Sequence, residues 1–471
     1  MRFSSGNWGL YTDFYELAMA QGYFYNGNKD DRAVFNYFFR TNPFGGGFTV
    51  FAGLQDFLDM LENFTFNDSD LNYLKTHGFD NGFLNYLKTF RFKGNIQCVN
   101  EGEIVFPNVP VMQIEGNIIE AQLIESFLLN ILNFESLIAT KAFRIKLAAR
   151  GRKFSDFGLR RAQGLGAIQA GRAAIIGGAS STSNVLAGKI YNIPVSGTQA
   201  HSWIQSFNSE IEAFRSFAKI HPENTTLLVD TYDTLKSGIP NAIMVAKEME
   251  KSGYRLKAVR LDSGDLAYLS KKARKMLDNE GLDYVKIIAS NQLNEYVIKS
   301  LIVDQHAPID FFGVGTELVT GKDEAALDGV YKLTEVNGRP KMKLSDNVEK
   351  ITLPSKKQVI RYYDLQGKFY RDAIVAEDED PDNVDIIYHP LHPELFTKVK
   401  GLPKESLLKP VIRDANLLKE EKTLTEIHNY LVSRASLLPD EHKRFISPHL
   451  YKAGISKKLM DTRNELAKKF K

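Results

Sequence analysis

The sequence is short of the features that mark several classes of protein. Its single cysteine, Cys98, rules out an internal disulfide framework and any metal site built from several cysteines. A chain with no disulfide to gain from an oxidising compartment is most simply placed in the cytoplasm, which is the location we expect. A membrane span needs a run of about 18 apolar residues, and the sequence has none. Asp13 and Glu16 interrupt the only candidate stretch near the N-terminus, so we expect no signal peptide.

A large excess of charge is also lacking. The 471 residues carry 60 basic and 57 acidic side chains, which gives a formal net charge of +3. So small an excess argues against nucleic acid as a partner. Apolar residues make up 43% of the chain and charged residues 25%, which is typical of a folded globular protein. The length exceeds what one hydrophobic core usually organises, so we expect two or three domains.

The middle of the chain alternates between short apolar or β-branched runs and helical patterns. Such alternation is typical of parallel βα units. At least seven units within about 200 residues favour an irregular (β/α) barrel of the TIM type, with a doubly wound open sheet as the alternative. The expected strands are residues 153–157, 174–180, 193–198, 226–230, 258–262, 285–290 and 309–315.

The flanking regions follow another pattern. Residues 90–120 alternate like strands and turns, residues 120–150 form one long helical pattern, and strand-like pieces return after residue 330. We therefore expect the barrel to be joined by an additional α+β domain, built from the N-terminal region and the C-terminal segments. The predicted organisation is an N-terminal α+β domain with a helical linker (1–150), a barrel domain (151–330) and C-terminal segments packing on the N-terminal domain (331–471).

Polar and glycine-rich segments follow the expected strands, at the point where each strand ends. In parallel α/β folds the ligand site lies at the carboxyl ends of the strands. Arginine, paired carboxylates, hydroxyls and glycine turns at converging strand ends suit a phosphorylated substrate bound with a metal ion. The segments are DFGLRR (156–161), GGASSTSN (177–184), GTQAHS (197–202), DTYD (230–233), RLDSGD (260–265), SN (290–291) and GVGT (313–316).

Arg260, Asp262 and Asp265 make the most specific of these segments. One arginine and two nearby carboxylates can hold a planar anion and a Mg²⁺ ion together. The alternative is a salt-bridged strand end followed by a helix, with Asp265 as the helix cap. The turn at 313–316 stands where many barrels hold a phosphate on backbone amides, although an ordinary tight turn has the same sequence.

His201 stands at an expected barrel strand end, directly before a helical pattern, and no other of the nine histidines does so. Asp230, at the end of the next strand, can fix the histidine tautomer and stabilise the charged form. Such a pair suits either a general base or a histidine that is itself phosphorylated, and the spacing does not choose between them. A hydrogen-bonded core histidine is the non-catalytic alternative.

Taken together and in this order, the segments resemble the nicotinate phosphoribosyltransferase family over residues 7–365. The resemblance implies a homodimer of irregular α/β barrels with active sites at the subunit interface. It implies transfer of phosphoribose from 5-phosphoribosyl 1-diphosphate to nicotinate, which gives nicotinate mononucleotide for NAD biosynthesis. The matching stretches are LYTDFY (10–15), FSDFGLRRA (154–162), GTQAHS (197–202), DTYDT (230–234), RLDSGD (260–265) and GVGT (313–316).

The resemblance also implies roles for single residues around the base and the histidine. His201 would be phosphorylated by ATP, a co-substrate whose turnover is coupled to product formation. Asp230 would orient that histidine as part of the catalytic set. Phe157 and Tyr15, the latter lent by the neighbouring subunit, would sandwich the pyridine ring.

A second group of implied roles concerns the anionic parts of the substrates. Arg260 would take the nicotinate carboxylate. Asp262 would act in catalysis near Mg²⁺ and the ribose diphosphate, with Asp265 as a second metal ligand. The other substrate-binding residues implied are Arg160 and Thr198 around the anions and Ser290, Asn291, Gly315 and Thr316 at the 5-phosphate.

Three other functions stay open. Relatives that use nicotinamide tend to place an aspartate in the second βα loop, whereas our alignment puts Asn184 near that place, and no carboxylate there would repel nicotinate. A Schiff-base aldolase needs a lysine at a strand end, and none of the seven segments has one. A non-catalytic protein that binds a phosphorylated metabolite could lose His201 or Asp262 without penalty, whereas both are present.

Overall fold

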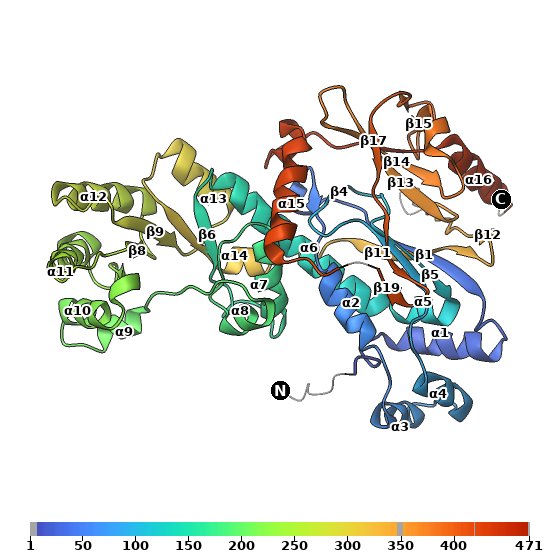
Figure 1. The fold of residues 1–471 in the computed structure, drawn as a ribbon, viewed down its shortest axis with the longest axis horizontal. Helices are drawn as coiled ribbons and strands as arrows, with labels where there is room; N and C mark the ends of the chain where they lie inside the picture. Colours follow the sequence, from blue (N-terminus) through green and yellow to red (C-terminus); the bar gives the residue numbers. More distant parts are fainter. Residues whose placement is uncertain (1–6, 346–351, 419, 470–471) are drawn as a thin grey trace. The chain divides into compact units, whose positions relative to one another are not determined.

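The structure is a computed structural model that describes residues 7–345, 352–418 and 420–469. The chain forms two compact units (Figure 1). The first unit combines the N-terminal part, up to Leu137, with the C-terminal part from Ala326, and the second unit is Ile138–Ala325. The boundary at Leu137 falls inside one continuous helix, α6 (Glu125–Ala148). Since a boundary within a helix does not mark a domain edge, the divisions near residues 150 and 330 stay a prediction.

A seven-stranded antiparallel sheet organises the first unit. One of its inner strands, β1 (Arg32–Phe39), pairs on one side with β11 (Gly329–Val336) and on the other with β5 (Met112–Asn117), the middle strand of the seven. The run AVFNYFF is buried almost throughout, because β-branched and aromatic side chains pack on both faces of this strand. Segments some 300 residues apart in sequence therefore share one sheet. Its other strands are β3 (Asn95–Cys98), β12 (Arg339–Pro340), β18 (Lys409–Arg413) and β19 (Asn416–Leu417).

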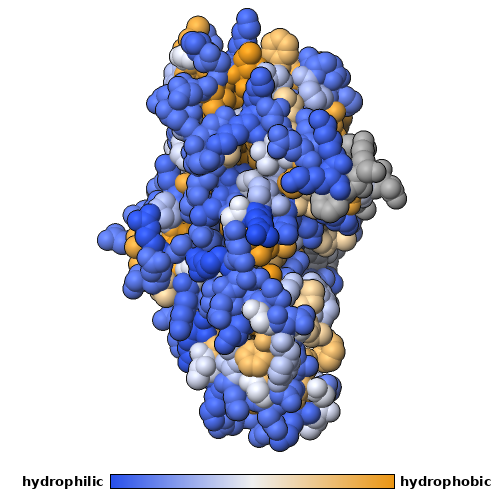
Figure 2. All heavy atoms as spheres, turned by 90° about the vertical axis from the view of Figure 1, so that its right-hand side faces the viewer, coloured by the Kyte–Doolittle hydropathy of each residue, from blue (hydrophilic) through white to orange (hydrophobic). Residues whose placement is uncertain are grey.

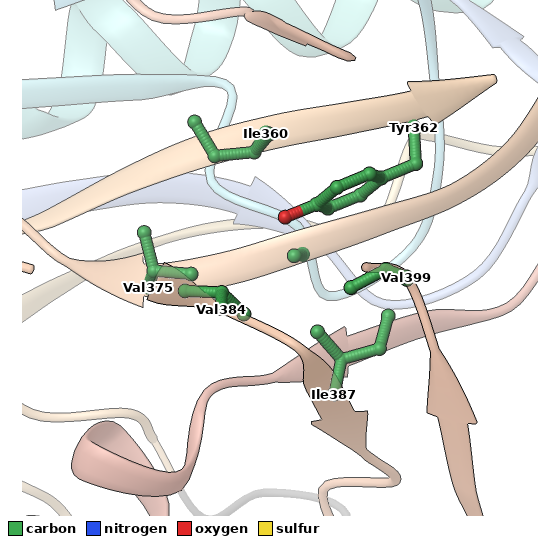
Figure 3. Close-up of a cluster of buried hydrophobic side chains, with 7 residues drawn as sticks. Ile360, Tyr362, Val375, Val384, Ile387 and Val399 are labelled. Carbon is green, nitrogen blue, oxygen red and sulfur yellow. The ribbon is translucent and has the colours of Figure 1, made fainter. Parts of the chain in front are cut away.

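A six-stranded sheet forms the rest of the C-terminal part. Its core gathers small and β-branched side chains around the ring of Tyr362 (Figure 3). The Tyr362 hydroxyl is buried in this apolar cluster and has no hydrogen-bond partner among the described residues. The strands are β13 (Lys357–Tyr363), β14 (Phe369–Ala376), β15 (Ile386–Tyr388), β16 (Phe396–Lys398), β17 (Lys404–Ser406) and β20 (Ala453–Ile455).

Helices and a short strand pair complete the first unit. Capping boxes start two of the helices, with Asn67 and Asp70 at α3 and Thr423 and Glu426 at α15, so their first amides are satisfied locally. The elements are α1 (Phe14–Tyr25), α2 (Leu54–Glu62), α3 (Asp68–Thr76), α4 (Asn81–Lys88), α5 (Ile118–Leu123), α15 (Leu424–Leu437), α16 (Lys457–Lys468), β2 (Thr49–Val50) and β4 (Ile104–Val105). On the face drawn in Figure 2, hydrophilic side chains predominate and the apolar ones lie in small scattered groups.

A buried ion-pair network ties α15 to the strands of the first unit. The Arg361 guanidinium is fully buried and binds both carboxylate oxygens of Asp372, at 2.8 Å each, and Glu103 Oε1 at 2.7 Å. Arg434 on α15 contacts the same Glu103 at 2.8 Å. Burial alone would lower the pKa of Arg361, but the carboxylates of Asp372 and Glu103 hold that pKa well above its ordinary value.

The second unit contains a five-stranded parallel sheet in the order β6–β10–β9–β8–β7, flanked by helices. α12 packs on β8 and β9, with α11 next to it and α10 next to α11 (Figure 1). The strands are β6 (Lys153–Asp156), β7 (Thr226–Leu228), β8 (Ala258–Leu261), β9 (Lys286–Ser290) and β10 (Phe311–Val314). The helices are α7 (Gly166–Ile176), α8 (Val185–Tyr191), α9 (His201–Gln205), α10 (Glu210–Ile220), α11 (Ile239–Lys251), α12 (Leu266–Asn279), α13 (Glu295–Lys299) and α14 (Thr316–Val319).

The mixed α/β fold with a parallel sheet confirms the coarse prediction, but a closed barrel is not found. Beyond β6 the sheet continues only through isolated parallel bridges, from Asp156 to Thr182 and from Thr182 to Val195. Within the described ranges no strand ladder joins the segment around Val195 to β7. A side-chain hydrogen bond, from Gln199 Nε2 to the carbonyl of Thr226 at 3.0 Å, crosses that gap.

Two predicted strands are corrected by the structure. Residues 174–180 were expected to be extended, but α7 runs through Ile176 and a turn follows it. An apolar run of a buried helix carries no periodicity that separates it from a strand, and this run is buried on all sides. The expected strand 193–198 contributes only the bridge at Val195.

The helical stretch Ile118–Ala148 is long and apolar enough to cross a membrane by length and composition alone. In its most apolar window, 67% of the residues are buried inside the protein. Burial of that kind is what a core helix shows. The described residues hold one stretch that passes this test, and the expectation of no membrane span stays a prediction.

Candidate active site

Arg260, at the end of β8, is the centre of the hydrogen bonds among the strand ends of the second unit. Its Nη2 donates to Asp262 Oδ1 at 2.7 Å, and its Nε donates to Ser290 Oγ at 2.9 Å. Its Nη1 donates to Thr198 Oγ1 at 3.0 Å and to the carbonyl of Gln199 at 3.3 Å. Its side chain is 15% exposed. The planar fork is therefore held by groups from three strand ends, and one Nη2–H has no acceptor among the described residues.

Phe157 lies against this guanidinium, 5.7 Å from its ring centre to the guanidinium carbon, so the ring face is attracted to the cation. The Phe157 amide donates to the carbonyl of Val314 at 2.8 Å, which fixes the turn after β6 against the end of β10. The ring rests on Gly313, because a Cβ at that glycine would lie 2.4 Å from the ring carbons. Gly313, the first glycine of the GVGT segment, is therefore required, because a side chain there would collide with the Phe157 ring.

Asp156 supports that turn from below, a role that we did not assign from the sequence. Its buried carboxylate accepts from the Gly158 amide and from the Thr182 hydroxyl, both at 2.7 Å. Burial raises the pKa of the Asp156 carboxyl, and the two hydrogen bonds oppose that rise. The available signal was its place at a strand end, directly before a Phe–Gly turn.

His201 opens the short helix α9, as expected, but its neighbours differ from the predicted one. Its Nδ1 lies 3.1 Å from Thr231 Oγ1, and its Nε2 lies 3.9 Å from Asp262 Oδ2. Its side chain is 41% exposed, so the ring is open to a reactant. The sequence pattern pointed to Asp230 as the partner of His201 and did not identify Thr231, the next residue along the chain.

Asp230 instead supports the loop that carries Asp262. Its Oδ2 accepts from the Asp262 amide and from the Ser263 hydroxyl, both at 2.7 Å. Its Oδ1 is buried and has no hydrogen-bond partner in the part of the chain that the structure describes. A cation bound beside Asp262 would satisfy this unpaired carboxylate oxygen. The role of Asp230 as the orienting partner of His201 stays a prediction.

The two aspartates predicted as metal ligands are used differently. Asp265 caps α12, with Oδ1 accepting from the Tyr268 amide at 2.9 Å, which is the alternative weighed for it from the sequence. Asp262 Oδ1 accepts from Arg260 and from Ser290, and its other oxygen faces His201. Among the described residues no three His, Cys, Asp or Glu side chains gather as a metal site. The donors fit a cation shared with substrate phosphates, which is how Mg²⁺ usually binds.

The ends of β9 and β10 lie next to each other, with Ser290 opposite Gly313 in the ladder. After β9 the backbone turns through two consecutive left-handed residues, Asn291 with φ 81° and Gln292 with φ 49°. Such strain in residues other than glycine is common at functional sites. Gly315 precedes α14, whose first residue is the exposed Thr316.

Three further residues named from the sequence lie apart from these contacts. Arg160 is exposed in the loop after β6. Tyr15 belongs to the first unit, in the first turn of α1, where its side chain is 49% exposed. Asn184 caps α8, accepting from the Ala187 amide and donating to a carbonyl of α7, both at 3.2 Å. Because that amide is buried and both its oxygen and its nitrogen bond within the protein, Asn184 carries no argument for acid over amide.

Comparison with known proteins decides the family. A model of the nicotinate phosphoribosyltransferase (NAPRTase) family matches residues 152–371, and the models of the N-terminal and C-terminal domains of the enzyme match residues 10–133 and 356–463. The nicotinate phosphoribosyltransferase of Bacillus subtilis is 43% identical over 96% of this chain and 94% of its own length. The chain belongs to the nicotinate phosphoribosyltransferase family.

Solved structures agree with that membership. The crystal structure of human nicotinic acid phosphoribosyltransferase matches with a TM-score of 0.87 and 30% identity, covering 97% of this chain and 99% of that one. The nicotinate-nucleotide pyrophosphorylase of Pyrococcus furiosus matches with a TM-score of 0.72 and 26% identity, over 93% and 98%. The recognition made from the strand-end segments is therefore confirmed.

The family assignment reaches further than the segments that suggested it. Tyr15 falls in the part matched by the N-terminal domain model, and the strand-end residues fall in the part matched by the family model. Residues 366–463 carry no segment that sequence reasoning could assign, yet most of the match to the C-terminal domain lies there.

Proposed function

We propose that this chain transfers phosphoribose from 5-phosphoribosyl 1-diphosphate to nicotinate, giving nicotinate mononucleotide and diphosphate in the salvage route to NAD. The observation that carries the proposal is Arg260. Its guanidinium lies over the Phe157 ring, is fixed by three strand ends and keeps one N–H without an acceptor among the described residues, in a chain whose named relatives are nicotinate phosphoribosyltransferases. An aromatic face beside a fixed cation suits a flat aromatic carboxylate.

The base binds between aromatic rings. Phe157 supplies one face, and Tyr15 from the second subunit of a homodimer supplies the other. Arg260 faces the nicotinate carboxylate, helped by the Thr198 hydroxyl that it holds. This site favours the acid over nicotinamide, because an uncharged amide gains less from a buried cation.

The ribose diphosphate lies on the β8 to β10 side. Arg160, Ser290 and Asn291 contact its anionic groups, and Gly315 and Thr316 hold the 5-phosphate on backbone amides. The pyridine nitrogen already carries its lone pair, so no general base is required. The residues instead align that nitrogen with C1 and stabilise the leaving diphosphate.

Asp262 is the carboxylate placed to hold Mg²⁺ on the substrate phosphates, with the orphaned Asp230 oxygen beside it. When bound, the ion neutralises charge on the departing diphosphate. Asp265 contributes less, since its Oδ1 is committed to the helix cap.

ATP is the co-substrate and His201 receives its γ-phosphoryl group. The half-exposed ring between Thr231 and Asp262 supports this role, because one ring nitrogen can be held while the other reacts. The phosphohistidine adds charge and oxygen ligands beside the metal position and so favours binding of the ribosyl diphosphate.

We also propose the arrangement around this chemistry. The parallel strands, with the segments around Thr182 and Val195, act as an irregular barrel whose open side is spanned by the Gln199–Thr226 hydrogen bond. The homodimer shares its active sites, and the cytoplasm stays the expected location.

The test is a product assay. Purified protein is incubated with 5-phosphoribosyl 1-diphosphate, Mg²⁺ and either nicotinate or nicotinamide, with and without ATP, and mononucleotide is measured. We expect product from nicotinate that ATP stimulates, and a His201→Ala variant that keeps slow transfer but loses the stimulation. Product from nicotinamide alone would overturn the substrate, and no product from either base would favour a metabolite-binding protein.

A further inference from the structure

Three serine hydroxyls form a closed cluster among the strand ends of the second unit. Ser155 on β6 is hydrogen-bonded to Ser181. Ser181 Oγ lies 2.7 Å from Ser196 Oγ, and Ser196 Oγ lies 3.2 Å from Ser155 Oγ. Each hydroxyl has one proton to donate, so the three bonds can run around a ring in which every donor is used. Hydrogen bonds in such a ring strengthen one another, and burial of Ser155 and Ser181 increases that effect.

The cluster stands where the parallel sheet loses its ladder. Beyond β6 the segments pair through two isolated bridges at Thr182 and not through a regular strand ladder. Five backbone hydrogen bonds link them, among them those from the Asp156 amide to the Ser181 carbonyl and from the Ser196 amide to the Thr182 carbonyl, both at 3.0 Å. The serine hydroxyls add side-chain hydrogen bonds across all three segments to this short backbone pairing.

The spacing of the serines links this cluster to the base site. Ser155 comes two residues before Phe157, and Ser196 comes two residues before Thr198. Phe157 and Thr198 both contact Arg260, through the aromatic ring and through a hydroxyl. The hydroxyl ring is therefore joined to these two groups through one intervening residue on each segment.

We propose that Ser155, Ser181 and Ser196 are positioning residues for the base site. The ring fixes the spacing of the segments that carry Phe157 and Thr198 and so sets the affinity for the pyridine carboxylate. The ribosyl diphosphate, assigned mainly to the β8 to β10 ends with Arg160 added from the loop after β6, depends less on the ring. This inference deepens the proposed function and rests on it for the identity of the base.

The kinetic test removes one hydroxyl at a time. In Ser181→Ala and Ser196→Ala the ring is broken, and we expect the KM for nicotinate to rise about 5-fold, the effect of one lost hydrogen bond. The KM for 5-phosphoribosyl 1-diphosphate should stay near its wild-type value. Ser196→Thr keeps the hydroxyl and should retain wild-type KM values for both substrates.

The matched control is Ser180→Ala. Ser180 adjoins the ring in sequence, but its hydroxyl donates to the Phe154 carbonyl at 2.9 Å and takes no part in the ring. It should leave both KM values unchanged. Equal effects of Ser181→Ala on both substrates, or an effect of Ser180→Ala as large as that of Ser181→Ala, would overturn the positioning role.

A second readout does not depend on activity. Hydrogen exchange, followed by mass spectrometry, reports the amides of Phe157 and Ser196, which bond across to neighbouring segments. Faster exchange of both amides in Ser181→Ala, with no change in Ser180→Ala, would support the conclusion that the serine ring stabilises the two segments that carry them. Unchanged exchange overturns it. If the wild-type protein made no nicotinate mononucleotide, the proposed function would fail while this measurement still decided the role of the ring.

Discussion

Arg361 in the first unit and Arg260 in the second each donate four hydrogen bonds to described protein groups, yet they differ in exposure and in charge balance. Arg361 is fully buried and is paired with two buried carboxylates, Asp372 and Glu103. Arg260 is 15% exposed and is paired with one carboxylate, Asp262, which is itself partly exposed. The comparison teaches that an arginine is structural when it and its counter-charges are sealed from solvent. It is available for binding when it stays partly exposed and a further anion can reach it.

The sharpest way to break this comparison is Arg361→Ala. Removal of the guanidinium leaves Asp372 buried without its counter-charge and Glu103 paired with Arg434 alone, and we expect a loss of about 3–5 kcal/mol in the free energy of unfolding. Urea denaturation followed by circular dichroism measures it. A loss below about 1 kcal/mol, the size typical of an exposed pair, would mean that the network is hydrated or dispensable.

The matched pair Arg260→Lys and Arg361→Lys separates binding from stability. Lysine keeps the charge but cannot reproduce the planar fork, so Arg260→Lys should raise the KM for nicotinate roughly 30-fold, which corresponds to about 2 kcal/mol. Its melting temperature should change little. Arg361→Lys should do the reverse, lowering the melting temperature with KM unchanged. Steady-state kinetics and thermal unfolding on both variants decide this, and a KM shift in Arg361→Lys would contradict the division.

Glu16 in the first unit differs from the two arginines because its buried carboxyl group is hydrogen-bonded to neutral hydroxyls and has no opposite charge as a partner among the described residues. Burial raises the pKa of Glu16 to about 7, partly offset by hydrogen bonds from Thr12 and Ser126. A raised acid pKa stabilises the fold fully below the unfolded value of 4.5, and that stability is lost as the pH rises through about 7. Relative to Glu16→Gln, the wild type should therefore lose on the order of 1–3 kcal/mol between pH 5 and pH 8.

Thermal unfolding of both proteins across this pH range tests the prediction. The variant serves as its own control, because every other titrating group is shared and cancels in the difference. A constant difference between the two melting temperatures would show that Glu16 does not titrate in this window.

The smallest expected effect concerns a buried polar group with no partner at all. Tyr362→Phe removes the orphaned hydroxyl from the apolar cluster without changing the ring, and we expect a gain of about 0.5–1 kcal/mol in unfolding free energy. Tyr37→Phe is the matched control, since the Tyr37 hydroxyl donates to Asn133 at 3.0 Å and its loss should destabilise the fold. Equal effects of the two substitutions in chemical denaturation would mean that the Tyr362 hydroxyl has a water partner.

Much of the second unit was predictable because its strands carry strong local patterns. The expected strands 258–262, 285–290 and 309–315 correspond to β8, β9 and β10, each a buried run that ends in polar or glycine residues. The run 174–180 failed because a helix buried on all sides has no polar face to reveal its period. The serine ring was not anticipated, since nothing in a serine's local sequence indicates two others across the sheet.

The candidate site divides in the same way. Residue types at strand ends showed which segments converge, and Arg260, Asp262, Thr198, Ser290 and Phe157 do share one network. The sequence was less informative about which of these side chains contact each other. His201 was assigned to Asp230 by sequence order, whereas its ring lies near Thr231 and Asp262.

The sequence by itself determined the family, most of the strands of the parallel region and the residue types at the strand ends, because motifs and periodicity are local properties of the chain. Only the tertiary structure decided which side chains meet. Arg260 bonds to Thr198 and Ser290, which lie 62 and 30 residues away. Contacts over such separations depend on strand register and on turns such as the one that Gly313 permits, and neither is encoded within a short window.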